Sequence, residues 1–187
     1  MPQATNAVVK TGYAPVPSGT KMYYEIHGAQ ASRSQPPLIL LHGGLGSTET
    51  VASLCSQLAL ARQVVTPDLP GHGRTADIDA AFSLEIFADD VSALAQHLKI
   101  EKADIFGYSL GAGTALQTTI RHPAQIRKAV LLSTVFRADG WYPEIVVAGL
   151  SAASPPTLMG SRPVSRAVNT AARSSSMPPV APASLRA

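Results

Sequence analysis

The alternation of short apolar runs with amphipathic stretches is the feature that most constrains the fold of this chain. Runs typical of strands lie at residues 21–28, 36–44, 62–71, 103–109 and 126–135, and stretches typical of helices lie at 48–59, 83–98 and 110–123. Parallel strands need a crossover connection, which is usually a helix. The alternation therefore predicts an α/β fold with a mostly parallel sheet of about six strands.

Two of the expected helices carry clear local signals. In the first, Val51, Leu54, Cys55 and Leu58 fall on one helical face. Ser83 is expected to cap the second helix, whose apolar residues recur at spacings of three and four.

The composition changes after about residue 150. Residues 151–187 contain six prolines and eight serines, but no aromatic residue, lysine, aspartate or glutamate. Such a segment buries too little apolar surface to offset the chain entropy lost on folding. We expect one domain over residues 1–150 and a disordered tail over residues 151–187. The tail composition also resembles a GC-rich gene read out of frame, a hypothesis that translating the DNA in the other two frames would test.

Charge and cysteine content limit the partners and the compartment. All 12 acidic residues lie at or before Glu144 while the tail adds four arginines, so the net charge of +3 reflects the tail and does not indicate nucleic-acid binding. No apolar run approaches the ~20 residues of a membrane span, and no signal peptide is evident. The single cysteine, Cys55, suits a reducing compartment. We predict a cytoplasmic protein that binds neither nucleic acid nor a membrane.

The segment Gly107-Tyr108-Ser109-Leu110-Gly111 fits the pattern G-x-S-x-G. It follows an apolar strand and opens a helix, which is the context in which this pattern exposes a serine nucleophile on a sharp turn. Side chains in place of Gly107 and Gly111 would collide with the neighbouring strand and helix. Ser109 is therefore the candidate nucleophile, and an ordinary glycine-rich loop is the alternative.

A second glycine-rich loop, HGGLGS (42–47), follows another apolar strand. In a serine hydrolase, an N–H group of this loop and the N–H group after the nucleophile stabilise the oxyanion. These positions nominate Gly44 and Leu110, with Leu45 as the alternative to Gly44. His42 is expected to brace the loop. Neither glycine segment has the lysine or the spacing of a nucleotide-binding motif.

Four motifs occur in the order and at the spacing of the α/β-hydrolase superfamily: HGGLGS (42–47), DLPGHGRT (68–75), GYSLG (107–111) and RHP (121–123). Over about residues 8–150 the chain resembles this superfamily, and the match is most similar to esterase, lactonase and epoxide-hydrolase-like members. The resemblance implies an α/β-hydrolase-type sheet and a triad of serine, acid and histidine, with no cofactor and no metal. It gives Ser109 the nucleophile position and gives Gly44 and Leu110 the oxyanion positions.

The triad acid and histidine are missing from the part of the chain that matches. The resemblance places them after a seventh and an eighth strand, whereas the match ends just past the sixth. His122 closes the helix that starts at Ser109, so it lies about 20 Å from the serine. Asp139 and Glu144 have no histidine to orient, and His72 is expected at the rim. We expect a C-terminally truncated member that keeps the N-terminal part of the sheet.

The predicted function is that of a serine hydrolase acting on a small ester, lactone or similar acyl substrate, impaired in this chain. The alternative is a non-catalytic hydrolase-like protein whose basic tail binds a partner. Cofactor-free oxygenases and haloperoxidase-like members share the scaffold and remain open. Without a neighbour, the apolar strand 126–135 would form an exposed edge, so we expect poor solubility.

Overall fold

The computed structural model describes residues 8–29 and 35–134, all of which belong to one compact unit, Met1–Gly140. The predicted boundary at residue 150, the predicted disordered tail and the residues Asp139 and Glu144 lie outside the described residues. No helix in these two ranges is long and apolar enough to cross a bilayer. The cytoplasmic location stays a prediction.

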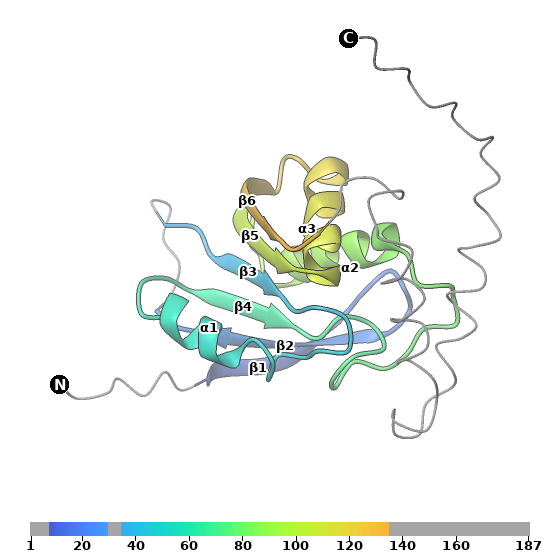
Figure 1. Ribbon diagram of the computed structural model, residues 1–187, viewed down its shortest axis with the longest axis horizontal. Helices are drawn as coiled ribbons and strands as arrows, with labels where there is room; N and C mark the ends of the chain where they lie inside the picture. The colour runs from blue at the N-terminus through green and yellow to red at the C-terminus, as the bar shows by residue number, and fades with distance from the viewer. Residues whose placement is uncertain (1–7, 30–34, 135–187) are drawn as a thin grey trace, which may run out of the picture. The chain divides into compact units, whose positions relative to one another are not determined.

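A six-stranded sheet forms the centre of the described chain, in the order β1-β2-β4-β3-β5-β6 (Figure 1). Its strands are β1 (Val8–Pro15), β2 (Lys21–His27), β3 (Leu38–Leu41), β4 (Val64–Pro67), β5 (Ala103–Tyr108) and β6 (Ile126–Leu132). The pairs β3–β4, β3–β5 and β5–β6 are parallel, whereas β2 runs antiparallel to β1 and β4. The predicted mostly parallel α/β sheet is confirmed, and β1 is the strand that no apolar run had indicated.

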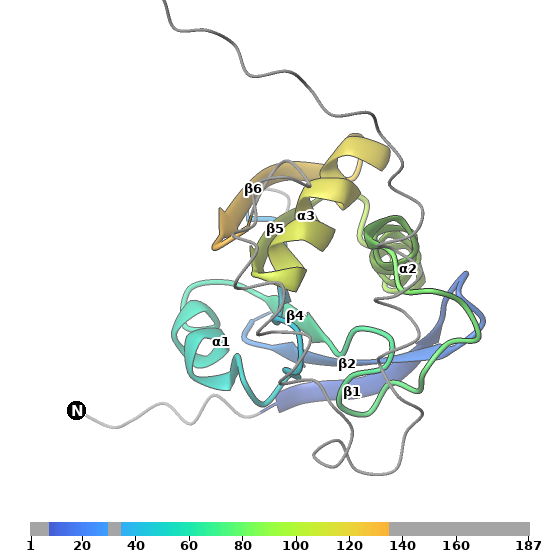
Figure 2. The same cartoon turned by 45° about the vertical axis from the view of Figure 1, so that its right-hand side comes forward.

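The helices cover both faces of the sheet. They are α1 (Ala52–Leu58), α2 (Leu84–His97) and α3 (Leu110–Arg121). Helix α1 lies on one face, and α2 and α3 lie side by side on the other (Figures 1 and 2). The three helices occupy the stretches that the sequence predicted.

Both faces of β3 are buried, which explains its uninterrupted apolar sequence. Leu38 and Leu40 pack with Cys55 of α1. Ile39 and Leu41 point to the opposite face and pack in the core formed with α2 and α3. Since successive side chains of a strand alternate between faces, a strand between two helical layers must be apolar at every position.

The helical signals were right in part. The Ser83 Oγ accepts a hydrogen bond from the Ile86 N–H at 3.2 Å, so Ser83 caps α2 as predicted. In α1, Cys55 is buried and Val51 and Leu58 pack against the same cluster, as their shared helical face predicted. Leu54, which was expected on that face, is 40% exposed. At 100° per residue it lies at the edge of the face that the other three form.

Strand β6 lies at the edge of the described sheet. Of its seven residues only Ile126 is buried, and Val130 and Leu132 are each 52% exposed. Strand β6 therefore has the apolar composition of a buried strand, although most of its side chains are exposed. Unpaired strand edges with apolar side chains promote association between molecules.

Replacing Val130 by lysine should reduce self-association, because a charge on an edge strand opposes edge-to-edge pairing. The free energy of unfolding should change by less than about 0.5 kcal/mol, as for most surface substitutions. Light scattering over a concentration series would measure the first effect and urea unfolding the second. Ile120→Lys adds the same charge on α3, where Ile120 is 62% exposed, and should reduce association less. Equal effects of the two substitutions would rule out the β6 edge as the cause of self-association.

A buried carboxylate at the start of β5 joins three segments of the chain. The Arg127 guanidinium of β6 donates to Asp104 Oδ1 and Oδ2 at 2.8 and 2.7 Å. Arg62, before β4, places its NH2 group 2.9 Å from Asp104 Oδ2. Hydrogen bonds from Arg127, followed by those from Arg62, lower the pKa of Asp104 despite its burial. The group therefore ties β5 both to β6 and to the segment before β4.

Asp104→Asn should lower the free energy of unfolding by about 3 kcal/mol at pH 7, because it leaves two arginines facing a neutral group. A carboxyl whose folded pKa is depressed contributes stability above its unfolded pKa of about 3.9, and this is lost as the pH falls through the folded pKa. The wild-type protein should therefore lose more stability than the variant as the pH falls below about 4. Urea unfolding at several pH values measures this, with the exposed Asp79→Asn as control. If the free energies of unfolding of wild type and Asp104→Asn fell in parallel below about pH 4, the ion pairs of Asp104 would not be the source of the pH dependence.

Candidate active site

Ser109 occupies a sharp turn between β5 and α3. Its φ of 52° and ψ of −114° form a combination that residues with a Cβ rarely adopt. The Ser109 N–H donates to the Leu132 carbonyl at 2.9 Å, and its carbonyl accepts from the N–H groups of Ala112 and Gly113. Hydrogen bonds therefore fix both peptide groups of the residue, and its side chain is only partly buried. The strand-to-helix turn that GYSLG predicts is present.

The glycines that flank the turn allow three backbone segments to meet. A Cβ on Gly107 would lie 2.1 Å from the Gly111 carbonyl oxygen, and a Cβ on Gly111 would lie 2.5 Å from the His42 carbonyl oxygen. Both distances are far below van der Waals contact. Glycine at these positions lets α3 start directly against β5 and the end of β3, as the sequence predicted.

The loop after β3 lies next to this turn. A Cβ on Gly43 would be 3.4 Å from the Ser109 Cβ, and one on Gly44 would be 3.9 Å from the Leu110 Cβ. The structure thus brings Ser109, Leu110 and Gly44 together. Leu110 is the first residue of α3, so its N–H has no partner within the helix. The Gly44 N–H forms no hydrogen bond with another described residue. The alternative donor Leu45 has φ of 61° and a side chain that is 67% exposed.

His42 connects this loop to the one after β4. The ring is fully buried, and its Nε2 accepts a hydrogen bond from the Leu69 N–H at 3.0 Å. Since Nε2 is the acceptor, Nδ1 carries the proton and donates to the Gly43 carbonyl at 2.8 Å. Burial lowers the pKa of His42, so the ring is neutral near pH 7. His42 braces the loop, as the sequence led us to expect.

Asp68 is a central residue of the site region that the sequence did not single out. It is fully buried, and its Oδ1 and Oδ2 accept hydrogen bonds from the Thr48 N–H at 2.6 Å and the Arg74 N–H at 2.8 Å. The Thr75 hydroxyl donates to the Asp68 carbonyl at 2.7 Å. One residue therefore holds the loop after β3 and the loop after β4. Gly73 makes room for this carboxylate, since a Cβ at that position would lie 2.2 Å from Asp68 Oδ2.

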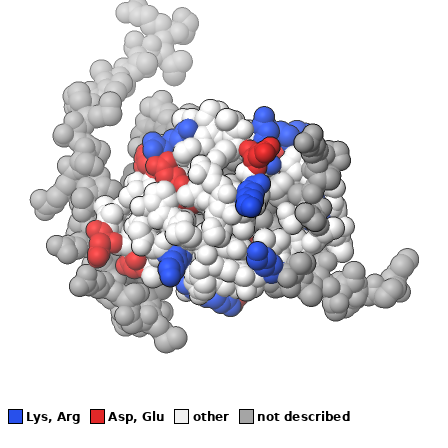
Figure 3. Space-filling model, turned by 180° about the vertical axis from the view of Figure 1, so that it is seen from behind, with Lys and Arg blue, Asp and Glu red and all other residues white. Residues whose placement is uncertain are grey.

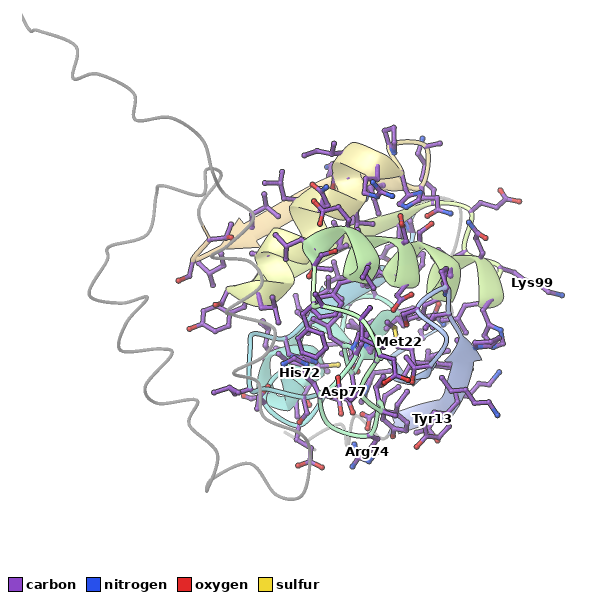
Figure 4. All side chains as sticks on the ribbon, turned by 90° about the vertical axis from the view of Figure 1, so that its right-hand side faces the viewer. Tyr13, Met22, His72, Arg74, Asp77 and Lys99 are labelled. Carbon is purple, nitrogen blue, oxygen red and sulfur yellow. The ribbon has the colours of Figure 1, made fainter. Side chains whose placement is uncertain are left out.

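His72 lies partly buried on the same loop as Arg74 (Figure 4). Its ring centroid is 5.2 Å from that of His42, and its Nδ1 is 2.9 Å from the Pro70 carbonyl. His122 caps the far end of α3 and places its Nε2 2.8 Å from Asp89 Oδ1. Among the described residues, no histidine or carboxylate forms a hydrogen bond with the Ser109 hydroxyl.

The two other histidines lie on β2 and at the end of α2. His27 Nε2 is 3.0 Å from Glu25 Oε2, and the His97 ring meets that of Tyr24 edge to face. Over residues 8–29 and 35–134, no group of three or more His, Cys, Asp or Glu side chains is arranged to hold a metal ion.

Residues 36–181 match the family described as the alpha/beta hydrolase fold, and the chain belongs to that family. The superfamily that the four motifs indicated is thereby confirmed. The matched range extends past residue 150, where we expected the resemblance to end.

Known proteins of several activities are similar to this chain. The 2-hydroxymuconate semialdehyde hydrolase of Pseudomonas sp. (strain CF600) is 33% identical over 102 residues, which cover 52% of this chain and 36% of that protein. A proline iminopeptidase of Lactobacillus helveticus is 31% identical over 133 residues, which cover 68% and 45%. The solved structure of Est816, an N-acyl homoserine lactone degrading enzyme, is 26% identical with a TM-score of 0.64, covering 75% and 52%. The chain thus spans about a third to a half of the relatives it matches.

Gly73→Ala should destabilise the protein by about 3 kcal/mol or more, because the new Cβ would overlap the buried Asp68 carboxylate. Gly19→Ala is a matched control. Both glycines have positive φ, 52° and 88°, but a Cβ on Gly19 has nothing within 4 Å. The control should cost only the roughly 1–2 kcal/mol of a left-handed alanine. Urea unfolding measures both, and equal losses would show that the contact with Asp68 is unimportant.

Proposed function

We propose that this protein is a serine hydrolase of its family, with Ser109 as the nucleophile and a small ester, lactone or similar acyl compound as the substrate. The observation that carries the proposal is the strained backbone of Ser109 at the β5–α3 turn. Such strain in a residue with a Cβ persists only where the surrounding structure enforces it, and it concentrates at functional sites. Here the Gly107 and Gly111 contacts enforce it.

The reaction assigned to this site is acyl transfer. The Ser109 Oγ attacks the carbonyl carbon of the substrate while a base takes its proton, and the carbonyl oxygen becomes an oxyanion. The N–H groups of Leu110 and Gly44 are the proposed donors to that oxyanion. The N-terminal end of α3 adds a favourable dipole at the same place. When the oxyanion collapses, the C–O bond of the ester or lactone breaks and its alcohol oxygen takes the proton; water then hydrolyses the acyl-serine, which releases the carboxylic acid and restores the Ser109 hydroxyl.

The described part of the chain shows no base in contact with Ser109. The sequence contains five histidines, the last of which is His122, and none forms a hydrogen bond to Ser109 in the described residues. Both ring nitrogens of His42 are occupied by loop contacts. We therefore infer that proton transfer is inefficient in this chain and that acyl turnover is weak. When a triad member is missing, the oxyanion donors and substrate binding still retain a small part of the rate acceleration.

The substrate class rests on the relatives. One is named a hydrolase of 2-hydroxymuconate semialdehyde, another a proline iminopeptidase, and the structural relative is described as degrading N-acyl homoserine lactones. The last of these substrates is an acyl compound with a lactone ring, which supports the lactone and ester assignment.

The chain should react slowly with a fluorophosphonate probe, and the adduct should map to the peptide that contains Ser109. Ser109→Ala should abolish both this adduct and the residual hydrolysis of p-nitrophenyl acetate, because the attacking oxygen is lost. Ser133→Ala is a matched control, since Ser133 is also a serine with positive φ, and it should leave labelling unchanged. Mass spectrometry of the digested adduct decides the matter. Labelling that survives Ser109→Ala would assign the nucleophile elsewhere.

A further inference from the structure

A cleft lies at the end of the sheet opposite Ser109. It encloses about 700 Å³ and is lined by residues that precede the parallel strands, including Pro37 before β3 and Lys102 before β5. Ser109, in contrast, follows the carboxyl end of β5. Because parallel strands present their two ends at opposite edges of a sheet, this cleft is separate from the candidate active site. Its volume is within the range of small-molecule sites.

Part of the cleft lining is apolar. Tyr24 and Val65, which are 3% and 1% exposed, belong to it. Ile26 of β2 and Leu98 and Ile100, which follow α2, add partly buried apolar side chains, and Gln63 and His97 are polar members of the lining. A ligand in this cleft would therefore bury apolar surface, which is the main favourable term in binding.

The edge of the cleft is basic. Three of the five lysines of the chain, Lys10, Lys99 and Lys102, line it, and all three are exposed. Glu101 is the one carboxylate among the described lining residues. None of these lysines forms an ion pair with another described residue. On the face seen in Figure 3, basic side chains lie as separate patches around largely uncharged surface.

The end of α2 explains only part of this grouping. Cations are favoured near a helix C-terminus, and Lys99 directly follows that end, from which its side chain extends outward (Figure 4). Lys99 has φ of 57°, in the position after a helix where glycine is usual. Lys10 comes from β1, far away in the sequence, so the helix end does not account for it. Two unrelated segments thus contribute lysines to one apolar cleft.

We propose that this cleft binds an amphipathic carboxylate, a small molecule with an apolar chain or ring and one carboxylate group. The apolar part contacts Ile26, Val65 and Leu98, and the carboxylate lies among the ammonium groups of Lys10, Lys99 and Lys102. Charge complementarity selects the anion, since the described lining has three lysines against one glutamate. Apolar burial supplies most of the affinity, because exposed ion pairs add little each.

Decanoate is a suitable probe, with decyltrimethylammonium as the same chain of opposite charge. Methyl-labelled NMR of the full chain should show saturable decanoate-induced shifts at Ile26, Val65 and Leu98, and not at Leu45 and Leu110 beside Ser109. The cation should bind at least about fivefold more weakly, because each charge contact is worth up to ~1 kcal/mol. The location of the shifts separates this proposal from the proposed function, which concerns the other edge of the sheet.

Two double variants with the same loss of charge provide the decisive comparison. Lys10→Gln/Lys102→Gln should weaken decanoate binding about fivefold to tenfold, and Lys21→Gln/Lys128→Gln should change it less than about twofold. All four lysines are exposed, so folding should be unaffected, which a thermal melt would verify. The proposal is overturned by shifts centred on Leu45 and Leu110, by equal weakening in both double variants, by equal binding of the cation, or by no saturable binding.

Discussion

The close backbone contact between β5, the first turn of α3 and the end of β3 is the constraint on which the rest of the structure depends. It exists because Gly107 and Gly111 have no side chains, and a Cβ at either position would overlap a neighbouring backbone. The same contact sets the dihedral angles of Ser109 and positions α3, whose Ala115 packs in the main core. The site and a large part of the core therefore have one common physical cause.

Local patterns in the sequence account for what could be predicted. Strand β3 is apolar at every position because it is buried on both faces. Ser83 caps α2 because its short polar side chain can accept a hydrogen bond from a free N–H group at the start of the helix. The turn at Ser109 is likewise local, since strand, glycines and helix adjoin in the sequence. Each of these features leaves a pattern in neighbouring residues, so a single sequence is enough to recognise it.

The features that were missed depend on partners distant in the sequence. Asp68 accepts a hydrogen bond from Thr48, 20 residues away, and Asp104 is held by Arg127, 23 residues away. Leu54 has the spacing of a buried residue but is 40% exposed. The basic cleft combines residues from β1, β2, β4 and the segment after α2. Only the folded topology brings such groups together, so no periodicity or motif could indicate them.

Through His42, the position of the loop after β3 depends on pH, and this dependence is separate from any catalytic step. The ring joins two loops by accepting at one nitrogen and donating at the other, and only one neutral tautomer can do both. A second proton would turn the acceptor into a donor that faces the Leu69 N–H. Burial, which lowers the pKa of His42, keeps that proton away at neutral pH. On acidification, protonation of His42 would break its hydrogen bond with the Leu69 N–H, and the loop that carries Gly43 and Gly44 would lose this brace.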